Sequence, residues 1–405
     1  SAHPLAALFS PRSVALVGAS SDPAKLGGRP LRNLLAFGYE GRIYPVNARA
    51  AEVQGVKAYP SVAVLPETVD QAIIVVPAQA VEAALADCAA RGVKVAQILS
   101  AGFAEVGGDG TAMQARVVDI ARRAGIRITG PNALGSVSPS DRFFATFSGL
   151  LDTLRPEPGV IGVATQSGAF GSHIYATMAE RGIGLSRSLA TGNEAYIDVA
   201  EAIGFLAADP ATRVICAALE GCRNGARLRA SLRAAAEAGK PVVIMKVGRT
   251  EVGAVAAATH TGSLAGEDRI FDAVFRAGGA WRAETVEEMV DIAYVCATGR
   301  MPVNRGTTIV TISGGLGVLM ADTAVEAGLD VAPMPAALGA EVRAFMPLAS
   351  GRNPIDTTAG GAGGPPSFAR LFDMVLSGSE SGSVLAYLAH IGRTPARFAE
   401  LEGPL

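Results

Sequence analysis

The sequence predicts an α/β protein built from doubly wound parallel sheets, and three observations support this fold class. Short apolar runs rich in β-branched residues recur along the chain, a glycine-rich turn follows several of them, and an alanine-rich stretch of helical character comes next. The apolar runs are continuous rather than alternating, which indicates strands buried on both faces by helices. With 405 residues, the chain has room for two or three such domains.

Composition excludes several classes of function. Charged residues make up only 18% of the chain, and the net charge is −2, so no basic face is expected for nucleic acid or an anionic membrane. The four cysteines lack CxxC spacing, which favours a reduced, cytoplasmic protein without a metal site. The first residues do not read as a signal peptide, and no stretch reaches the roughly 18 apolar residues of a membrane span.

Residues 1–140 are expected to form the first domain. Apolar runs over 14–17, 72–76 and 95–99 each lead into a turn, and the segment 78–90 is rich in alanine. This order of strand, turn and helix is typical of a doubly wound nucleotide-binding domain.

Two further domains are expected after a Pro-rich linker at 152–159. For the second, over 155–300, we expect strands at 160–164, 213–219 and 241–246, and helices near 168–182, 197–207, 225–238 and 284–298. The third, over 305–405, begins with the apolar run 307–312 and the turn 313–317. It ends 16 residues after the apolar run 383–389, too soon for the remaining strand–helix pairs, so we expect this domain to be truncated. The glycine-rich stretch 359–366 is expected to be a loop.

Gly18, Ala19, Ser20 and Ser21 directly follow the first apolar run. Glycine lets a phosphate approach the backbone closely, and the N-terminus of the next helix attracts negative charge, which favours a nucleotide or CoA pyrophosphate. The GxGxxG pattern is absent, and the second strand ends in Asn47 instead of an acidic residue, which argues against NAD. An ordinary strand–helix turn remains the alternative.

A second such turn is 165–171 (TQSGAFG). Ser167 lacks the flanking glycines of a hydrolase elbow, so an anion site at a helix N-terminus is the better interpretation. The segment Gly130, Pro131 and Asn132, taken alone, is simply a turn that leaves the first domain.

One histidine lies in a segment of small and hydroxyl-bearing residues, where it is not expected to pack in a hydrophobic core. His260 lies within 259–266 (THTGSLAG). A neutral imidazole is nucleophilic near pH 7 and can accept a phosphoryl group and pass it on. Glu220 ends the apolar run 214–219, and a carboxylate there can hold the second ring N–H. An exposed histidine and a surface glutamate are the simpler interpretations of each segment alone.

Taken together, these segments resemble the NDP-forming (ADP-forming) acyl-CoA synthetases, namely the α part of the acetate–CoA ligases and, more distantly, the succinyl-CoA synthetase α subunit. The resemblance runs from about residue 5 to the end, and its most specific motifs are 259–266 (THTGSLAG) and 219–221 (LEG). The segments 165–168 (TQSG) and 130–132 (GPN) also match. The resemblance implies a Rossmann-like CoA-binding domain followed by two flavodoxin-like domains, the last one incomplete.

The resemblance also implies roles for individual residues. His260 carries phosphate and Glu220 supports it, both as catalytic residues. Phosphate faces Ser167, Gly168 and Ala169. The residues that fall where the family contacts CoA are Gly18, Ala19, Ser20, Ser21, Asn47, Ser100, Ala101, Gly102 and Asn132. Arg49 is a looser match to a basic residue that contacts CoA.

The implied reaction forms an acyl-CoA thioester from a carboxylic acid, CoA and ATP, or runs in reverse, through acyl phosphate and phosphohistidine. It implies an ATP-grasp module, on a partner subunit or a fused C-terminal part, that binds ATP or ADP with Mg²⁺, and an oligomeric assembly. Ser172 replaces a tyrosine of the succinyl-CoA synthetase α subunit, so the acyl pocket differs.

Several alternatives stay open at this point. They are a non-catalytic CoA-binding or CoA-sensing protein, the synthetase-like part of a protein acetyltransferase, an NAD-dependent dehydrogenase and a serine hydrolase acting through Ser167. The residues do not identify the carboxylic acid: acetate, a longer or branched acid and an aryl acid all fit.

Overall fold

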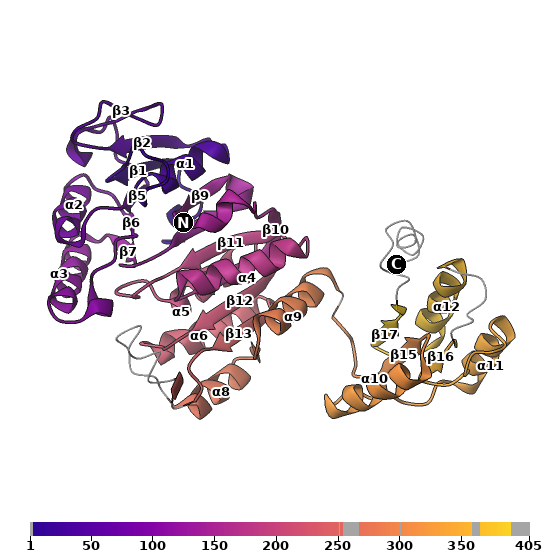
Figure 1. Ribbon diagram of the computed structural model, residues 1–405. Coiled ribbons are helices and arrows are strands. Elements are labelled where there is room, and N and C mark those ends of the chain that lie inside the picture. The colour runs from indigo at the N-terminus through magenta and orange to yellow at the C-terminus, as the bar shows by residue number, and fades with distance from the viewer. Residues whose placement is uncertain (1–2, 251, 254–266, 300, 359–364, 390–405) are drawn as a thin grey trace. The chain divides into compact units, whose positions relative to one another are not determined.

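The computed structural model describes residues 3–250, 252–253, 267–299, 301–358 and 365–389, with side chains omitted at 365–366. These residues form two compact units, Ser1–Gly299 and Arg300–Leu405, which are drawn in Figure 1. The first unit contains two large sheets, and the second contains a small one.

The first sheet is parallel throughout, with the strand order β2-β1-β5-β6-β7. Its strands are β1 (Ser13–Val17), β2 (Arg42–Val46), β5 (Gln71–Ile74), β6 (Val95–Ile98) and β7 (Arg127–Thr129). A two-stranded ribbon of β3 (Glu52–Val53) and β4 (Val56–Lys57) lies beside it. The central strands β1, β5 and β6 are buried at every position, as their continuous apolar runs predict.

Helices cover both faces of this sheet (Figure 1). On one face, residues such as Ile74 and Ile98 pack against α2 (Ala78–Ala90) and α3 (Asp109–Ala124). On the other, Leu16 and Ile73 pack against Leu31 and Leu34 of α1 (Arg29–Ala36). The doubly wound arrangement expected from the sequence is present.

The second sheet has seven strands in the order β14-β13-β12-β10-β11-β8-β9. Its parallel part comprises β10 (Pro158–Thr165), β11 (Leu185–Ala190), β12 (Val214–Leu219), β13 (Val242–Lys246) and β14 (Trp281–Arg282). Helices α5 (Val199–Ala208), α6 (Gly225–Glu237) and α8 (Asp268–Ala277) share one core with this sheet. Helices α4 (Gly168–Glu180) and α9 (Val286–Thr298) share the core on the other face.

A hairpin that the sequence did not lead us to expect completes this sheet. Strands β8 (Gly135–Ser138) and β9 (Phe143–Thr146) are antiparallel, and β8 pairs with β11, with Val137 opposite Ser188. Phe143 and Ala145 of β9 also pack in the core beneath the first sheet. The hairpin therefore belongs to both cores and joins the two sheets into one body.

The second unit contains a parallel sheet of three strands in the order β16-β15-β17. The strands are β15 (Thr307–Thr311), β16 (Ile355–Asp356) and β17 (Ser383–Tyr387), and the helices are α10 (Gly314–Glu326), α11 (Ala336–Phe345) and α12 (Pro365–Gly378). Val310 and Ile355 pack against Leu338, Phe368 and Leu371. None of the described helices in either unit combines the length and the apolar character that crossing a bilayer requires.

Candidate functional site

Gly18 directly follows β1 at the carboxyl edge of the first sheet, where ligands bind in open α/β folds. Its φ is +91°, and a Cβ atom at this position would lie 2.2 Å from the carbonyl oxygen of Val75. Only glycine fits this backbone path. Its amide donates to the carbonyl of Val46 at 3.1 Å, which ties β1 to the end of β2.

The turn after Gly18 is held from the second strand. Asn47 donates from Nδ2 to the carbonyl of Ala19 at 2.9 Å and accepts from the amide of Arg49 at 2.8 Å. The amide of Ser20 donates to the carbonyl of Gly27 at 3.1 Å, and Ser21 is exposed. The side chain of Asn47 thus shapes the turn, and Arg49 is exposed beside it.

The segment Ser100, Ala101 and Gly102 follows β6 at the same edge. Ser100 donates from Oγ to the carbonyl of Val76 at 2.6 Å, and its own carbonyl accepts from the amide of Asn132 at 2.8 Å. Glu105 accepts from the amide of Gly102 at 2.6 Å. Burial acts to raise the pKa of Glu105, but hydrogen bonds from Asn193 and nearby amides outweigh it and lower that pKa.

The turn between β10 and α4 has the form of an anion site. Ser167 caps α4, because its Oγ accepts from the amide of Phe170 at 3.4 Å. A Cβ atom on Gly168 would lie 2.5 Å from Cβ of Leu134, so glycine allows the helix start to pack closely there. The first turn of α4 begins at Gly168 and Ala169, so backbone N–H groups and the positive end of the helix dipole lie there, next to Ser167.

Glu220 lies at the carboxyl end of β12, and its backbone is clamped by Gln166. The Oε1 atom of Gln166 accepts from the amide of Gly221 at 3.0 Å and also from the amide of Glu220. The Nε2 atom of Gln166 donates to the carbonyl of Gly221 at 3.1 Å. Glu220 is 9% exposed.

A pocket of about 520 Å³ brings several of these residues together. The turn after β10 and Glu220 form one wall, and Asn132 after β7 and Asn193 after β11 form another. The residues that line it are Leu26, Arg29, Asn132, Leu134, Phe147, Ser148, Gly149, Gln166, Ser167, Gly168, Ala169, Ser172, Gly192, Asn193 and Glu220. The volume is within the range of small-molecule sites.

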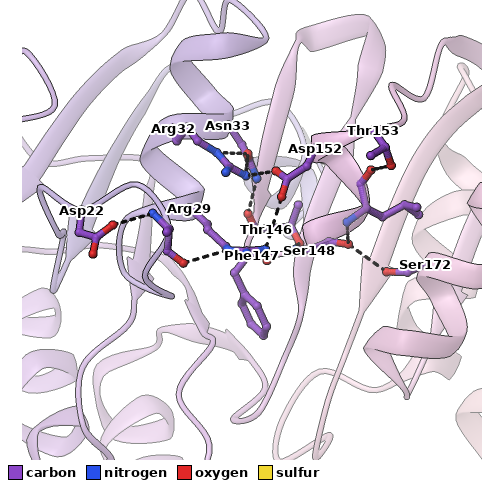
Figure 2. A network of polar contacts seen from close by, with 12 residues as sticks. Asp22, Arg29, Arg32, Asn33, Thr146, Phe147, Ser148, Asp152, Thr153 and Ser172 are labelled. Atoms are coloured by element: carbon purple, nitrogen blue, oxygen red, sulfur yellow. Dashed lines mark hydrogen bonds and ion pairs between the residues drawn. The ribbon is translucent and has the colours of Figure 1, made fainter.

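A third wall comes from α1 and the segment after β9, and sequence reasoning missed most of it. Figure 2 shows Arg29, whose Nε donates to the carbonyl of Ala24 at 3.1 Å and whose Nη1 lies 3.4 Å from the carbonyl oxygen of Phe147. Ser148 and Ser172 also line this wall, with their hydroxyl oxygens 3.3 Å apart. The serine expected to change the acyl pocket, Ser172, therefore does face the cavity.

The strand beside Glu220, β13, precedes the predicted phosphate carrier in the sequence. β13 pairs with β12 in parallel, with Lys246 opposite Leu219. Lys246 is 2% exposed, and burial lowers its pKa. His260 follows in the chain but lies outside the described residues. Among the described residues, no three His, Cys, Asp or Glu side chains gather into a possible metal site.

Three family models match the chain. A CoA binding domain matches residues 12–139, a succinyl-CoA ligase-like flavodoxin domain matches 158–296, and a ligase-CoA domain matches 307–404. The α subunit of acetate–CoA ligase (ADP-forming) I from Pyrococcus furiosus is 40% identical over 358 residues, which is 87% of this chain and 76% of that subunit. The chain belongs to the ADP-forming acyl-CoA synthetases. These enzymes are ligases that join an acid to a thiol.

Other synthetases similar to this one differ in the acid that they are named for. A trans-feruloyl-CoA synthase from an unknown prokaryote is 34% identical, and a 4-hydroxybutyrate–CoA ligase (ADP-forming) from Nitrosopumilus maritimus is 31% identical; each comparison covers 94% of this chain and 54% of the relative. The chain thus spans about half the length of these two relatives.

A solved structure shares the fold of this synthetase. The acetyl-coenzyme A synthetase 1 from Ca. Korarchaeum cryptofilum, in complex with phosphate and ADP, superposes with a TM-score of 0.88 and 35% identity, covering 94% of this chain and 81% of that one. The expected α/β class, with a CoA-binding domain followed by ligase-type flavodoxin domains, is confirmed.

The predicted site residues of the synthetase fall into three groups. Asn132, Ser167, Gly168, Ala169 and Glu220 line one pocket. Gly18, Ala19, Ser20, Ser21, Asn47, Ser100, Ala101 and Gly102 lie in turns at the carboxyl edge of the first sheet. His260 lies outside the described residues.

Proposed function

We propose that this chain is the CoA-binding and phosphate-carrying part of an ADP-forming acyl-CoA synthetase, with His260 as the phosphate carrier. Residues 1–140 bind CoA, residues 155–300 carry the phosphohistidine loop, and residues 305–405 form a further flavodoxin-like domain. The observation that carries the proposal is the pocket in which the N-terminus of α4, Asn132 and Glu220 converge. β13 pairs with β12, the strand that precedes Glu220, and His260 follows β13 in the sequence.

The first-sheet turns fit a CoA pyrophosphate. Position 18 requires glycine, because its φ is +91° and a Cβ atom there would lie 2.2 Å from the carbonyl oxygen of Val75. Glycine also leaves no side chain between the backbone and the ligand. Asn47 holds the turn through Ala19, and it carries no negative charge that would repel phosphate. Ser20, Ser21, Ser100, Ala101 and Gly102 complete this edge. CoA supplies the thiol that the acyl group joins.

The pocket supplies what a phosphoryl relay needs. Amide groups at the start of α4, beside Ser167, Gly168 and Ala169, favour the negative charge of phosphate. Glu220 accepts the N–H of one imidazole nitrogen of His260, so the other nitrogen carries the lone pair that attacks phosphorus. The wall formed by Arg29, Ser148 and Ser172 holds the acyl group.

In the direction that makes ATP, phosphate displaces CoA from the acyl-CoA thioester, which gives acyl phosphate and free CoA. His260 then attacks phosphorus, the P–N bond forms, and the carboxylate leaves. An ATP-grasp module, in a partner subunit or a fused C-terminal part, binds ADP with Mg²⁺ and receives the phosphoryl group to make ATP. In the opposite direction, ATP drives thioester formation.

Thioester synthesis by the chain together with its ATP-grasp module, supplied as a separate subunit, tests this function. Carboxylic acids are screened for acyl-CoA formation that requires both ATP and CoA, and CoA binding to the chain alone is measured by calorimetry. We expect thioester with at least one acid, and loss of it in His260→Ala. CoA binding without thioester from any acid, and full activity of His260→Asn, would each indicate a non-catalytic CoA-binding protein.

A further inference from the structure

Glu194 is a buried carboxyl group that takes no part in the proposed phosphoryl relay. It lies in the turn between β11 and α5, is 5% exposed and has a φ of +52°, in the left-handed region that glutamate rarely adopts. Its Oε1 accepts from the amide of Val199 at 2.7 Å and lies 3.1 Å from Oγ1 of Thr191. Strained backbone of this kind is kept where surrounding contacts hold it, often at functional sites.

The second oxygen of this carboxyl group is hydrogen-bonded to Gln166, a residue that lines the pocket. Oε2 of Glu194 accepts from Nε2 of Gln166. The opposite end of the same amide, Oε1 of Gln166, accepts from the backbone amides of Glu220 and Gly221. Glu194 therefore fixes which way the Gln166 amide points, and Gln166 in turn fixes the backbone that carries the Glu220 carboxylate.

The amide of Gln166 has only one orientation that satisfies its neighbours. With Oε1 towards Glu220 and Gly221, both backbone N–H groups find an acceptor, and Nε2 donates to Glu194 and to the carbonyl of Gly221. The reverse orientation sets donor against donor at the Glu220 end and acceptor against acceptor at the Glu194 end. Because the whole cluster is buried, such mismatches are costly.

We propose that Glu194 is a positioning residue of the synthetase, which acts through Gln166 to hold the backbone of Glu220, and with it the Glu220 carboxylate, in the wall of the pocket. This inference rests on the proposed role of Glu220. Glu194 itself is not among the residues that line the pocket, so it has no direct contact with a reactant there. Its effect is on the phosphoryl step and not on CoA affinity.

An amide cannot replace the ionised carboxylate of Glu194, which is the form present above about pH 7 because burial raises its pKa to that value. Both oxygens of Glu194 face an N–H donor, the amide of Val199 on one side and Nε2 of Gln166 on the other. In Glu194→Gln one of these positions becomes an NH₂ group, so either the start of α5 or Gln166 loses its acceptor. The combined change Gln166→Glu with Glu194→Gln reverses the donor and the acceptor of this pair. The amide at position 194 then donates to one carboxylate oxygen at position 166, and the other oxygen still accepts from the amides of Glu220 and Gly221.

The test uses the chain with its ATP-grasp subunit and measures the rate at which ATP phosphorylates His260. At pH 8, where Glu194 is ionised, we expect Glu194→Gln to lower this rate about ten-fold or more, as for loss of a hydrogen bond to a charged group, while the KM for CoA stays within about two-fold. The exchanged pair, Gln166→Glu with Glu194→Gln, recovers part of the loss. Glu201→Gln, which removes a carboxylate of α5 paired with Arg127, leaves the rate unchanged.

A double-mutant cycle separates positioning from general stability. If Glu194 acts through Glu220, adding Glu194→Gln to Glu220→Gln causes little further loss; full additivity overturns the proposal. A wild-type phosphorylation rate in Glu194→Gln, or a loss confined to CoA affinity, also overturns it. Should Glu194→Gln fail to fold, Gln166→Met breaks the same clamp and must show the same loss. Absence of phosphohistidine in the unmodified chain contradicts the proposed function instead.

Discussion

Asn132 donates from Nδ2 to Oδ1 of Asn193 at 3.3 Å. Asn132 follows the last strand of the first sheet, and Asn193 follows β11 of the second, so this contact joins the turns of the two sheets at the rim of one pocket. Asn193 also donates from Nδ2 to Oε1 of Gln114 at 2.9 Å and to Glu105. Glu105 in turn holds the amide of Gly102. The proposed CoA and phosphate sites are therefore connected through side-chain amides and one carboxylate.

Replacing Asn193 by Ala removes the centre of this connection. Because Glu105 and Gln114 then lose a buried donor, we expect the turn at Gly102 to loosen and CoA affinity to fall about ten-fold, the cost of one or two buried hydrogen bonds. Calorimetry with CoA on the chain alone measures this. Asn304→Ala is the matched control, since Asn304 also bonds to backbone groups of a turn but lies in the second unit. Equal CoA affinity in both variants contradicts the prediction.

Gly18→Ala should disturb the first-sheet turn directly. The new methyl group would lie 2.2 Å from the carbonyl oxygen of Val75 at a φ of +91°, so the variant must shift the strand end or accept strain of about 1–3 kcal/mol. We expect a lower melting temperature and weaker CoA binding. Gly225→Ala serves as control, because the nearest atom to its Cβ is 4.0 Å away and its φ is not in the left-handed region. A Gly18→Ala protein that binds CoA as tightly as the wild type refutes the assignment of this turn.

Ser167→Ala separates the helix cap from phosphate binding. Loss of the cap on α4 costs about 1 kcal/mol of stability, and the same is expected for Thr285→Ala, whose Oγ1 accepts from the amide of Glu288 at 3.1 Å at the start of α9. Only Ser167→Ala should also raise the KM for phosphate in acyl-CoA cleavage. If the two variants lose stability alike and neither changes that KM, the turn at Ser167 is a cap alone.

Glu194 should give the stability of the protein a characteristic pH dependence. Burial is the largest influence and raises the pKa of Glu194 from 4.5 to about 7, against the hydrogen bonds from Val199 and Gln166; the nearby Asp198 raises it further. Between these two values the folded protein keeps a proton that the unfolded chain releases, so the contribution of Glu194 to the free energy of unfolding falls as pH rises from 4.5 to about 7.

Urea denaturation of the wild type and of Glu194→Gln at several pH values isolates this contribution, because the other titrating groups are common to both proteins. The difference in the free energy of unfolding should shift against the wild type across this window and level off above it. A difference that is constant with pH shows that Glu194 keeps an ordinary pKa.

Much of the fold was predictable because its determinants are local. The runs over 14–17 and 95–99 are apolar at successive positions, and the strands that form there are buried on both faces, as in a sheet covered by helices. The turns at Gly18 and Ser167 come immediately after such strands in the sequence, so their positions could be predicted as well. Asn132 and Glu220 meet in one pocket because each follows a strand, and the carboxyl ends of parallel strands gather at one edge.

Other features depend on contacts that no local pattern reveals. The hairpin of β8 and β9 has short strands without a glycine-rich turn, and its place in the second sheet is decided by pairing with β11, some 50 residues later in the chain. Glu194 and Lys246 read as ordinary polar residues in the sequence, yet both are buried. Residues distant in sequence lie against them, namely Gln166 beside Glu194 and Phe271 beside Lys246. Arg29 and Phe147 line the same wall of the pocket, but they are far apart in the sequence and meet only in the folded protein.

The central claim is that His260 carries the phosphoryl group. Incubating the chain and its ATP-grasp subunit with ATP labelled at the γ-phosphate, followed by peptide mapping, tests it most directly. We predict an acid-labile, base-stable adduct on the peptide containing His260, absent in His260→Ala and weaker in Glu220→Gln. Label that persists on the His260→Ala chain, or acyl-CoA made at the normal rate with no labelled histidine, contradicts the account.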